Sequence, residues 1–181
     1  MSPMNNSTLP DSIASWTKPA SWPIDEINDA IKREPSMALS DEHVAALRGF
    51  LAFEPDEGVR LTGRLAQTDD LQSYGVLIYA AFVTAVRRRF SPTWTVPEVI
   101  GFVASVRARL LGDEIEIDPR AAELLMRRAL GDSVTGDLDD ETKARAQILV
   151  LAELIADEQL NASGLDQFMG QARALADQLV G

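Results

Sequence analysis

A short group of arginines offers the clearest chemistry in this sequence. Residues 85–111 hold five Arg and one Glu, a net charge of +4 in a chain whose total is −11. Arg87, Arg88 and Arg89 are consecutive, and Trp94 follows them closely. Guanidinium groups bind carboxylate or phosphate through two parallel hydrogen bonds, and an indole ring supplies a stacking face. The pattern predicts a site for a small anionic ligand or an acidic partner peptide around these four residues.

The same arginines also have a structural explanation. A cation near the C-terminus of a helix stabilises the carbonyl ends there, and all five Arg residues stand where a helix is expected to end. Arg also pairs readily with Asp and Glu, which are abundant in this chain. This structural account is favoured over anion binding, and the sequence leaves both open.

Motifs of the common enzyme classes are missing from the sequence. There is no phosphate-binding P-loop, no G-x-G-x-x-G and no G-x-S-x-G. The chain has no cysteine, and its one histidine, His43, is expected to be a partly exposed group in the first turn of a helix. A single histidine cannot build a multi-histidine metal site. These absences favour a non-enzymatic protein without settling the question, and no cofactor is expected.

The densest acidic run, four acids between Asp137 and Glu141, could suggest a cation site. An EF-hand that started at Asp137 would need Gly and Glu at its sixth and twelfth positions, where this chain has Thr142 and Ile148. Negative charge at a helix N-terminus is stabilising by itself. We therefore interpret the run as the start of a helix and predict no metal site.

The segment LIADEQLNASGLDQF, Leu154 to Phe168, resembles the acidic helix-turn-helix step of the tellurite-resistance TerB domain. That family is an all-helical bundle with acidic residues between its helices. Asp157, Asn161 and Ser163 stand at the matching polar positions, and Glu158 replaces the Gly expected after the Asp. The resemblance covers only these residues, and no metal binding is carried over from it.

Residues 1–22 are rich in Ser, Pro, Asn and Thr without a helical period, so they are expected to form an extended or disordered arm. The arm carries Trp16 and Trp22. Tryptophan is usually buried, which favours packing of these side chains onto the domain. Tryptophan is also enriched at interaction hot spots, so the arm as a docking peptide is the second interpretation.

The elements that must position these residues are predicted to be helices. The stretch 71–90 has no charge before Arg87, and only Thr84 is overtly polar between Val76 and Val86. A helix that is apolar on every side must be buried on every side. We therefore expect an all-α fold in which residues 23–181 form a single-domain bundle of about seven or eight helices around a buried central helix, about 71–90.

Helix boundaries are predicted from capping residues and turn signals. Ser40, Thr95, Asp118 and Ser163 are expected to cap four of the helices, and a long helix is expected over about 141–159. Amphipathic patterns with mostly short connections on both sides of residues 71–90 are typical of antiparallel neighbours in a bundle.

Charge and hydropathy indicate the environment and the partners. The acidic balance, with a pI near 4.5, disfavours direct contact with nucleic acid or anionic membranes and suits basic or neutral partners. The first residues lack the basic and apolar regions of a secretory signal, and the uncharged run from Leu71 is shorter than a membrane span needs. A cytoplasmic protein is expected, and a homo-oligomer is compatible with the sequence.

These observations rank three functions. The first is a non-enzymatic protein-protein interaction or regulatory module with a protein partner. The second is a helical domain, or an enzyme, that binds a small anionic ligand beside Arg87–Arg89 and Trp94, with Tyr74 or Tyr79 as a polar group of an apolar pocket. The third is an acidic mimic of nucleic acid, which the net charge of −9 after Gly112 permits.

Overall fold

The computed structural model describes residues 39–54, 60, 62–65, 71–110 and 116–180. No strand occurs in these residues, and residues 62–65 form a helical turn. The helices with defined bounds are α2 (Asp41–Leu51), α4 (Leu71–Arg89), α5 (Val96–Arg109), α6 (Pro119–Ala129), α7 (Asp140–Glu158) and α8 (Ala162–Val180). The predicted all-α bundle is confirmed, whereas the predicted arm, 1–22, lies outside the described residues.

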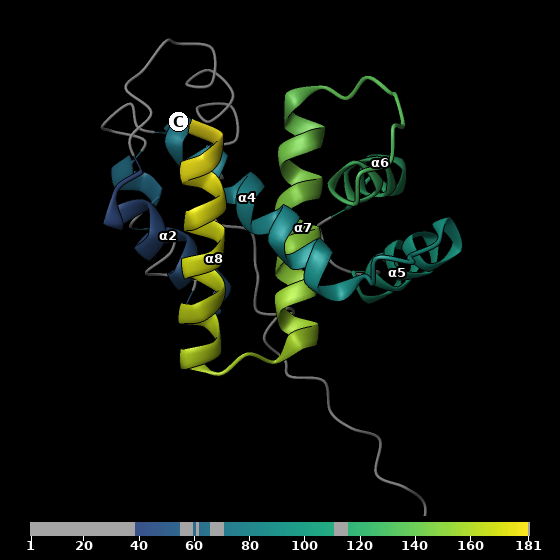
Figure 1. The fold of residues 1–181 in the computed structure, drawn as a ribbon. Coiled ribbons are helices and arrows are strands. Elements are labelled where there is room, and N and C mark those ends of the chain that lie inside the picture. The colour runs from purple at the N-terminus through teal and green to yellow at the C-terminus, as the bar shows by residue number, and fades with distance from the viewer. Residues whose placement is uncertain (1–38, 55–59, 61, 66–70, 111–115, 181) are drawn as a thin grey trace, which may run out of the picture.

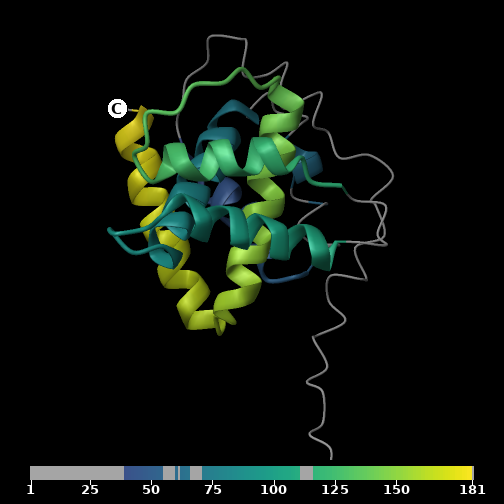
Figure 2. The ribbon, with the colours of Figure 1, turned by 90° about the vertical axis from the view of Figure 1, so that its right-hand side faces the viewer.

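Helix α4 occupies the centre of the bundle, as the sequence predicts. It runs obliquely between α8 and α7, its two main neighbours, and it also contacts α2 and α6 (Figure 1). Helices α5 and α6 lie side by side on the face that Figure 2 turns toward the viewer. Ile78, Phe82 and Val83 are buried, which confirms that α4 is the core helix of the fold.

The helix starts follow the expected capping chemistry. The N-cap residues of α2, α5, α6 and α7 are Ser40, Thr95, Asp118 and Asp139, each with extended backbone geometry before the first helical turn. A side chain that accepts from a free N–H of the first turn replaces the hydrogen bond that the helix cannot supply there. Short polar residues at these positions therefore determine where the helices begin.

The predicted exposure of His43 is wrong, because the structure buries this side chain completely. His43 is the third residue of α2, and its Nδ1 accepts a hydrogen bond from the backbone N–H of Ser40 at 2.8 Å. The imidazole thus takes the place that a Glu fills in the usual capping box. Its ring also stacks at 6.3 Å from Tyr74 of α4, so the histidine belongs to the buried face of α2.

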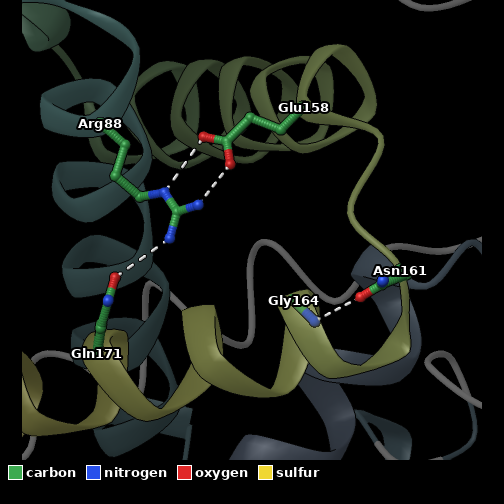
Figure 3. Close-up of polar contacts among 5 residues, drawn as sticks. All are labelled: Arg88, Glu158, Asn161, Gly164 and Gln171. Carbon is green, nitrogen blue, oxygen red and sulfur yellow. Dashed lines mark hydrogen bonds and ion pairs between the residues drawn. The ribbon is translucent and has the colours of Figure 1, made fainter.

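The predicted cap of the last helix is also wrong. Helix α8 begins at Ala162, before Ser163, and Asn161 Oδ1 accepts a hydrogen bond from Gly164 N–H at 2.8 Å (Figure 3). Asn and Ser cap helices about equally well, so residue type alone does not choose between them. The preceding helix ends with Gln159 in the left-handed conformation, and this turn brings Asn161 to the capping position.

Candidate binding pocket

The first half of α4 has one open stripe. Gln72, Gly75 and Val76 are half-buried, and Tyr79 is 42% exposed. Their spacing of three and four residues places them in a line along one side of the helix. The sequence predicts burial on every side from Val76 onward, and the structure departs from that prediction along this line.

The open stripe forms one wall of a pocket of about 400 Å³, which we call the α4–α7 pocket. Its walls are the stripe and Ile78 on α4, the first turns of α7, and the end of α8. The lining residues are Gln72, Gly75, Val76, Ile78, Tyr79, Asp140, Lys143, Ala144, Gln147, Ile148 and Leu179. In Figure 1 this is the upper part of the bundle, where α7 begins and α8 ends. Ligand pockets in proteins have volumes of roughly 300 to 1,000 Å³ and mainly apolar walls.

Two large hydrophobic side chains border this pocket in exposed positions. Tyr79 extends from α4, and Leu179, which is 50% exposed, extends from the last turn of α8. Within the residues that the structure describes, the other large hydrophobic side chain with such exposure is Ile100 on α5, which does not line the pocket. Exposed apolar surface is therefore concentrated at the α4–α7 pocket.

The charged groups of the pocket pair with each other, and one of its amide oxygens lacks a partner. Lys143 Nζ lies 2.9 Å from Asp140 Oδ1. Gln147, which also lines the pocket, is only 9% exposed. The Oε1 atom of Gln72 is buried without a hydrogen-bond partner in the described part of the chain. Buried amides normally form hydrogen bonds, so Gln72 marks unused binding capacity.

The predicted arginine site has a different character, because Arg88 is engaged within the fold (Figure 3). Its Nη2 lies 2.7 Å from Glu158 Oε2, and its Nε donates to the other carboxylate oxygen at 3.3 Å. The Nη1 atom donates to Gln171 of α8, and the guanidinium lies 5.8 Å from the centre of the Phe168 ring. Arg88 therefore joins α4 to α7 and α8.

The neighbouring members of the predicted site make separate contacts. Arg87 Nε donates to the backbone carbonyl of Ala129 at 2.9 Å, and the Arg89 guanidinium lies 5.6 Å from the Phe90 ring centre. Trp94 is half-buried and packs against the hydrophobic core. The site predicted at these residues stays a prediction. Trp16 and Trp22, the tryptophans of the predicted arm, lie outside the described residues.

A second arginine forms ion pairs between α5 and α7. Arg109 Nε lies 2.7 Å from Glu153 Oε2, and its Nη1 lies 3.5 Å from Asp157 Oδ1. Burial raises the pKa of the Glu153 carboxyl, although the positive charge of Arg109 opposes this shift. The pair therefore holds a carboxylate in a place where its charged form is poorly solvated.

The two tyrosines suggested as polar groups lie in different environments. Tyr79 lines the α4–α7 pocket, whereas Tyr74 is buried on another side of α4 and does not line it. Burial raises the pKa of Tyr74 to about 12, against the opposing effect of a hydrogen bond from Thr62. Tyr74 thus keeps its proton at neutral pH, and its ring packs in the core beside His43.

The acidic run before α7 supplies the N-cap residue of that helix, Asp139. Asp139 accepts from the backbone N–H of Thr142 at 2.8 Å, and this hydrogen bond holds the pKa of the Asp139 carboxyl below its usual value.

Across residues 39–54, 60, 62–65, 71–110 and 116–180, no three acidic, His or Cys side chains are grouped as a metal site requires. No helix in the same residues is both long enough and apolar enough to cross a bilayer.

The sequence did contain a signal for the pocket, although charge patterning concealed it. Gln72, Gly75 and Tyr79 are among the less apolar residues of the central stretch, and they share one side of a helix. A search for charge and catalytic motifs ignores such neutral residues. Moreover, the opposite wall comes from α7 and α8, which lie more than sixty residues away in the sequence, so no local pattern could reveal the cavity.

Comparison with known proteins finds no matching family model, no matching curated protein and no matching solved structure. The resemblance of Leu154–Phe168 to the TerB domain therefore has no support from a family match. In the structure, Asp157 of that segment lies near Arg109, and Asn161 caps α8.

Proposed function

We propose that this protein is a non-enzymatic interaction module that binds a partner protein at the α4–α7 pocket. The observation that supports the proposal is the pairing of two exposed hydrophobic side chains, Tyr79 and Leu179, at the border of one mainly apolar hollow. Soluble proteins seldom expose contiguous apolar surface unless a ligand or partner covers it. A groove between helices is also a common docking place for an apolar side chain of another protein.

Small-molecule binding in the same pocket is the second candidate, and the pocket volume of about 400 Å³ favours it. An anionic ligand at the arginines has less support, because it would compete with Glu158 and Gln171 for Arg88. The acidic nucleic-acid mimic rests on net charge alone. A cytoplasmic location is part of our proposal, since a chain without cysteine needs no oxidising compartment.

The experiment compares three full-length baits in the same lysate: the natural chain, Ala144→Phe and Ile100→Ser. Ala144 lines the pocket, so a phenyl group there fills it, whereas Ile100 is an exposed hydrophobic residue outside it. Quantitative mass spectrometry should find partners that the natural chain and Ile100→Ser retain and that Ala144→Phe loses. Thermal melts establish that each bait is folded.

Two results would overturn the proposal. One is a set of partners that Ala144→Phe retains in full, which would place binding elsewhere. The other is a natural chain that retains nothing above the level of a tag-only control. A further bait without residues 1–22 asks whether Trp16 and Trp22 contribute, and an unchanged partner set would remove the arm from the interaction.

A further inference from the structure

We propose that residues 16–22 of this chain occupy the α4–α7 pocket, so that a partner protein has to displace them before it binds. The inference rests on the proposed function, because it names how that same site is regulated. Three observations support it: the place at which the chain enters α2, the length of chain before that place, and the chemistry of residues 16–22.

The chain enters α2 at the end of the bundle that holds the pocket. Helix α2 lies beside α8 (Figure 1). Asp41, the first residue of α2, forms an ion pair at 2.5 Å with Arg173 in the second half of α8. Arg48, near the end of α2, pairs with Asp166 near the start of α8. The two helices are therefore antiparallel, and the start of α2 lies toward the end of α8. Leu179, at the border of the pocket, follows Arg173 by six residues, about 9 Å along a helix.

The chain before α2 is long enough to reach the pocket. Trp22 precedes Leu39, the first described residue, by 17 residues, and Trp16 precedes it by 23. A random coil of the shorter length spans roughly 20–25 Å on average, which exceeds the rise of α8 between Arg173 and Leu179. A segment tethered within reach of its site has an effective concentration on the order of millimolar. Even weak binding therefore fills the site for much of the time.

Residues 16–22 contain aromatic side chains that suit the pocket. They include Trp16 and Trp22, two of the three tryptophans in the chain. The pocket of about 400 Å³ accommodates one indole, and the exposed ring of Tyr79 at its border offers an aromatic contact. The Oε1 atom of Gln72 is already buried, so an indole in the pocket takes no water from it.

Charge distinguishes this segment from the rest of the chain before α2. Lys18 is the only charged residue in the range 12–24, which therefore has a net charge of +1. Residues 137–145, which include the first turns of α7, carry four acids and two bases, a net charge of −2. Residues 25–38 also carry four acids and two bases. The start of α7 therefore attracts residues 16–22 and repels residues 25–38.

The test places a nitroxide spin label beside the pocket and measures which tryptophans lie near it. The full-length chain has no cysteine, so Gln178→Cys provides a single labelling position. Gln178 is exposed in the last turn of α8 and does not line the pocket. We expect the label to broaden the indole N–H signals of Trp16 and Trp22 in the NMR spectrum. Trp94, which follows the far end of α4, is the internal reference and should keep its signal.

Pocket variants separate docking from random encounters of the tethered segment with the label. Ala144→Phe fills the pocket, and in the same labelled chain it should restore the signals of Trp16 and Trp22. Lys18→Glu changes no lining residue and should restore them in part. A label at Ala104→Cys, on the exposed surface of α5, should leave both signals intact. Thermal melts establish that each variant folds.

A peptide of residues 12–24 then measures the regulation. The full-length Trp16→Ala/Trp22→Ala variant leaves the pocket free, whereas the natural segment competes with the peptide. If the segment occupies the pocket for half to nine tenths of the time, the peptide should bind the double variant roughly two- to tenfold more tightly than the natural chain. Amide shifts at Gly75, Ala144 and Gln147 report this binding.

Three results would overturn the inference. One is signal loss at Trp16 and Trp22 that Ala144→Phe and Lys18→Glu leave unchanged. The second is peptide binding of equal strength to the natural chain and the double variant. The third is signal loss that appears only when ¹⁵N-labelled chains are mixed with spin-labelled, unlabelled-nitrogen chains, which would make a second copy the occupant.

These measurements need no partner protein, so they fail or succeed independently of the proposed function. If the spin label detects no docking but the Ala144→Phe bait still loses its partners, the interaction pocket stands and residues 16–22 do not regulate it. If docking is found but no bait retains a partner, the segment occupies the pocket and the proposed function fails.

Discussion

The contact between α4 and α7 has two ends of opposite character. At the open end, Gln72–Tyr79 of α4 faces Asp140–Ile148 of α7 across the pocket, and the amide oxygen of Gln72 is buried without a partner in the described residues. At the closed end, Arg88 of α4 binds Glu158 of α7, and Arg109 of α5 lies against Glu153 one turn earlier.

The difference shows that charge concentrated in one part of the sequence can be used within the fold itself. Opposite charges on neighbouring helices form ion pairs inside the fold, so the arginines act as connections between helices, although Nη2 of Arg109 has no hydrogen-bond partner in the described residues. The apolar hollow is lined by Gln72, whose amide oxygen has no partner in the described residues, and it is the site that we propose for a partner protein. This contrast predicts how substitutions at the two ends differ in their effects on stability.

The largest expected effect distinguishes the two ends of α8. Phe168 is fully buried beneath Arg88, so Phe168→Ala should lower the free energy of unfolding by about 3–5 kcal/mol. Leu179 is half exposed at the pocket, and Leu179→Ala should cost less than about 1 kcal/mol. Urea denaturation of both variants measures this. Similar losses would mean that the pocket border supports the fold as much as the closed end does.

The next effect concerns the turn at the closed end. Asn161→Ala removes the cap of α8 and should destabilise the protein by about 1 kcal/mol. Ser163→Ala, two residues later, should change the stability by less than about 0.5 kcal/mol. Thermal and urea melts of the pair compare them directly. A larger loss from Ser163→Ala would restore the capping residue expected from the sequence.

The ion pair at the closed end should be worth more than a surface pair near the open end. A double-mutant cycle on Arg88 and Glu158, whose side chains are 33% and 19% exposed, should give a coupling of about 0.5–1 kcal/mol. The same cycle on Arg145 and Glu141, which are 47% and 54% exposed, should give about 0.3 kcal/mol. Equal couplings would remove the energetic distinction between the ends.

The smallest effect is a pH dependence at the closed end. The pKa of Glu153 is raised in the folded protein, so the folded state holds this proton more tightly than the unfolded state. Stability should therefore fall as pH rises from the ordinary glutamate value of about 4.5 through the raised value. Relative to Glu153→Gln, the natural chain should lose unfolding free energy across this interval in urea melts at stepped pH. A constant difference between the two would show that burial does not affect this carboxyl.

Much of the fold followed from patterns that operate over one or two helical turns. The uncharged stretch before Arg87 identified the central helix, and Ser40, Thr95 and Asp118 identified three helix starts. Such features depend on backbone N–H groups that need acceptors and on side chains that repeat along one face, and both are written locally in the chain.

The sequence predicted less about side chains whose surroundings are formed by several helices. The imidazole of His43 was expected at the surface, but the packing of α2 against α4 buries it beside Tyr74. The arginines showed where charge is concentrated, and yet their partners, Glu158 and Glu153, lie 70 and 44 residues further along the chain. Local spacing does not specify such pairs.

The sequence by itself therefore determined that the chain forms helices, where most of them begin and which one lies in the core. Only the tertiary structure decided which side of α4 stays open and which arginines are neutralised. The physical reason is that helix formation depends on neighbours within a few residues, whereas a cavity or an ion pair depends on how α7 and α8 pack against α4.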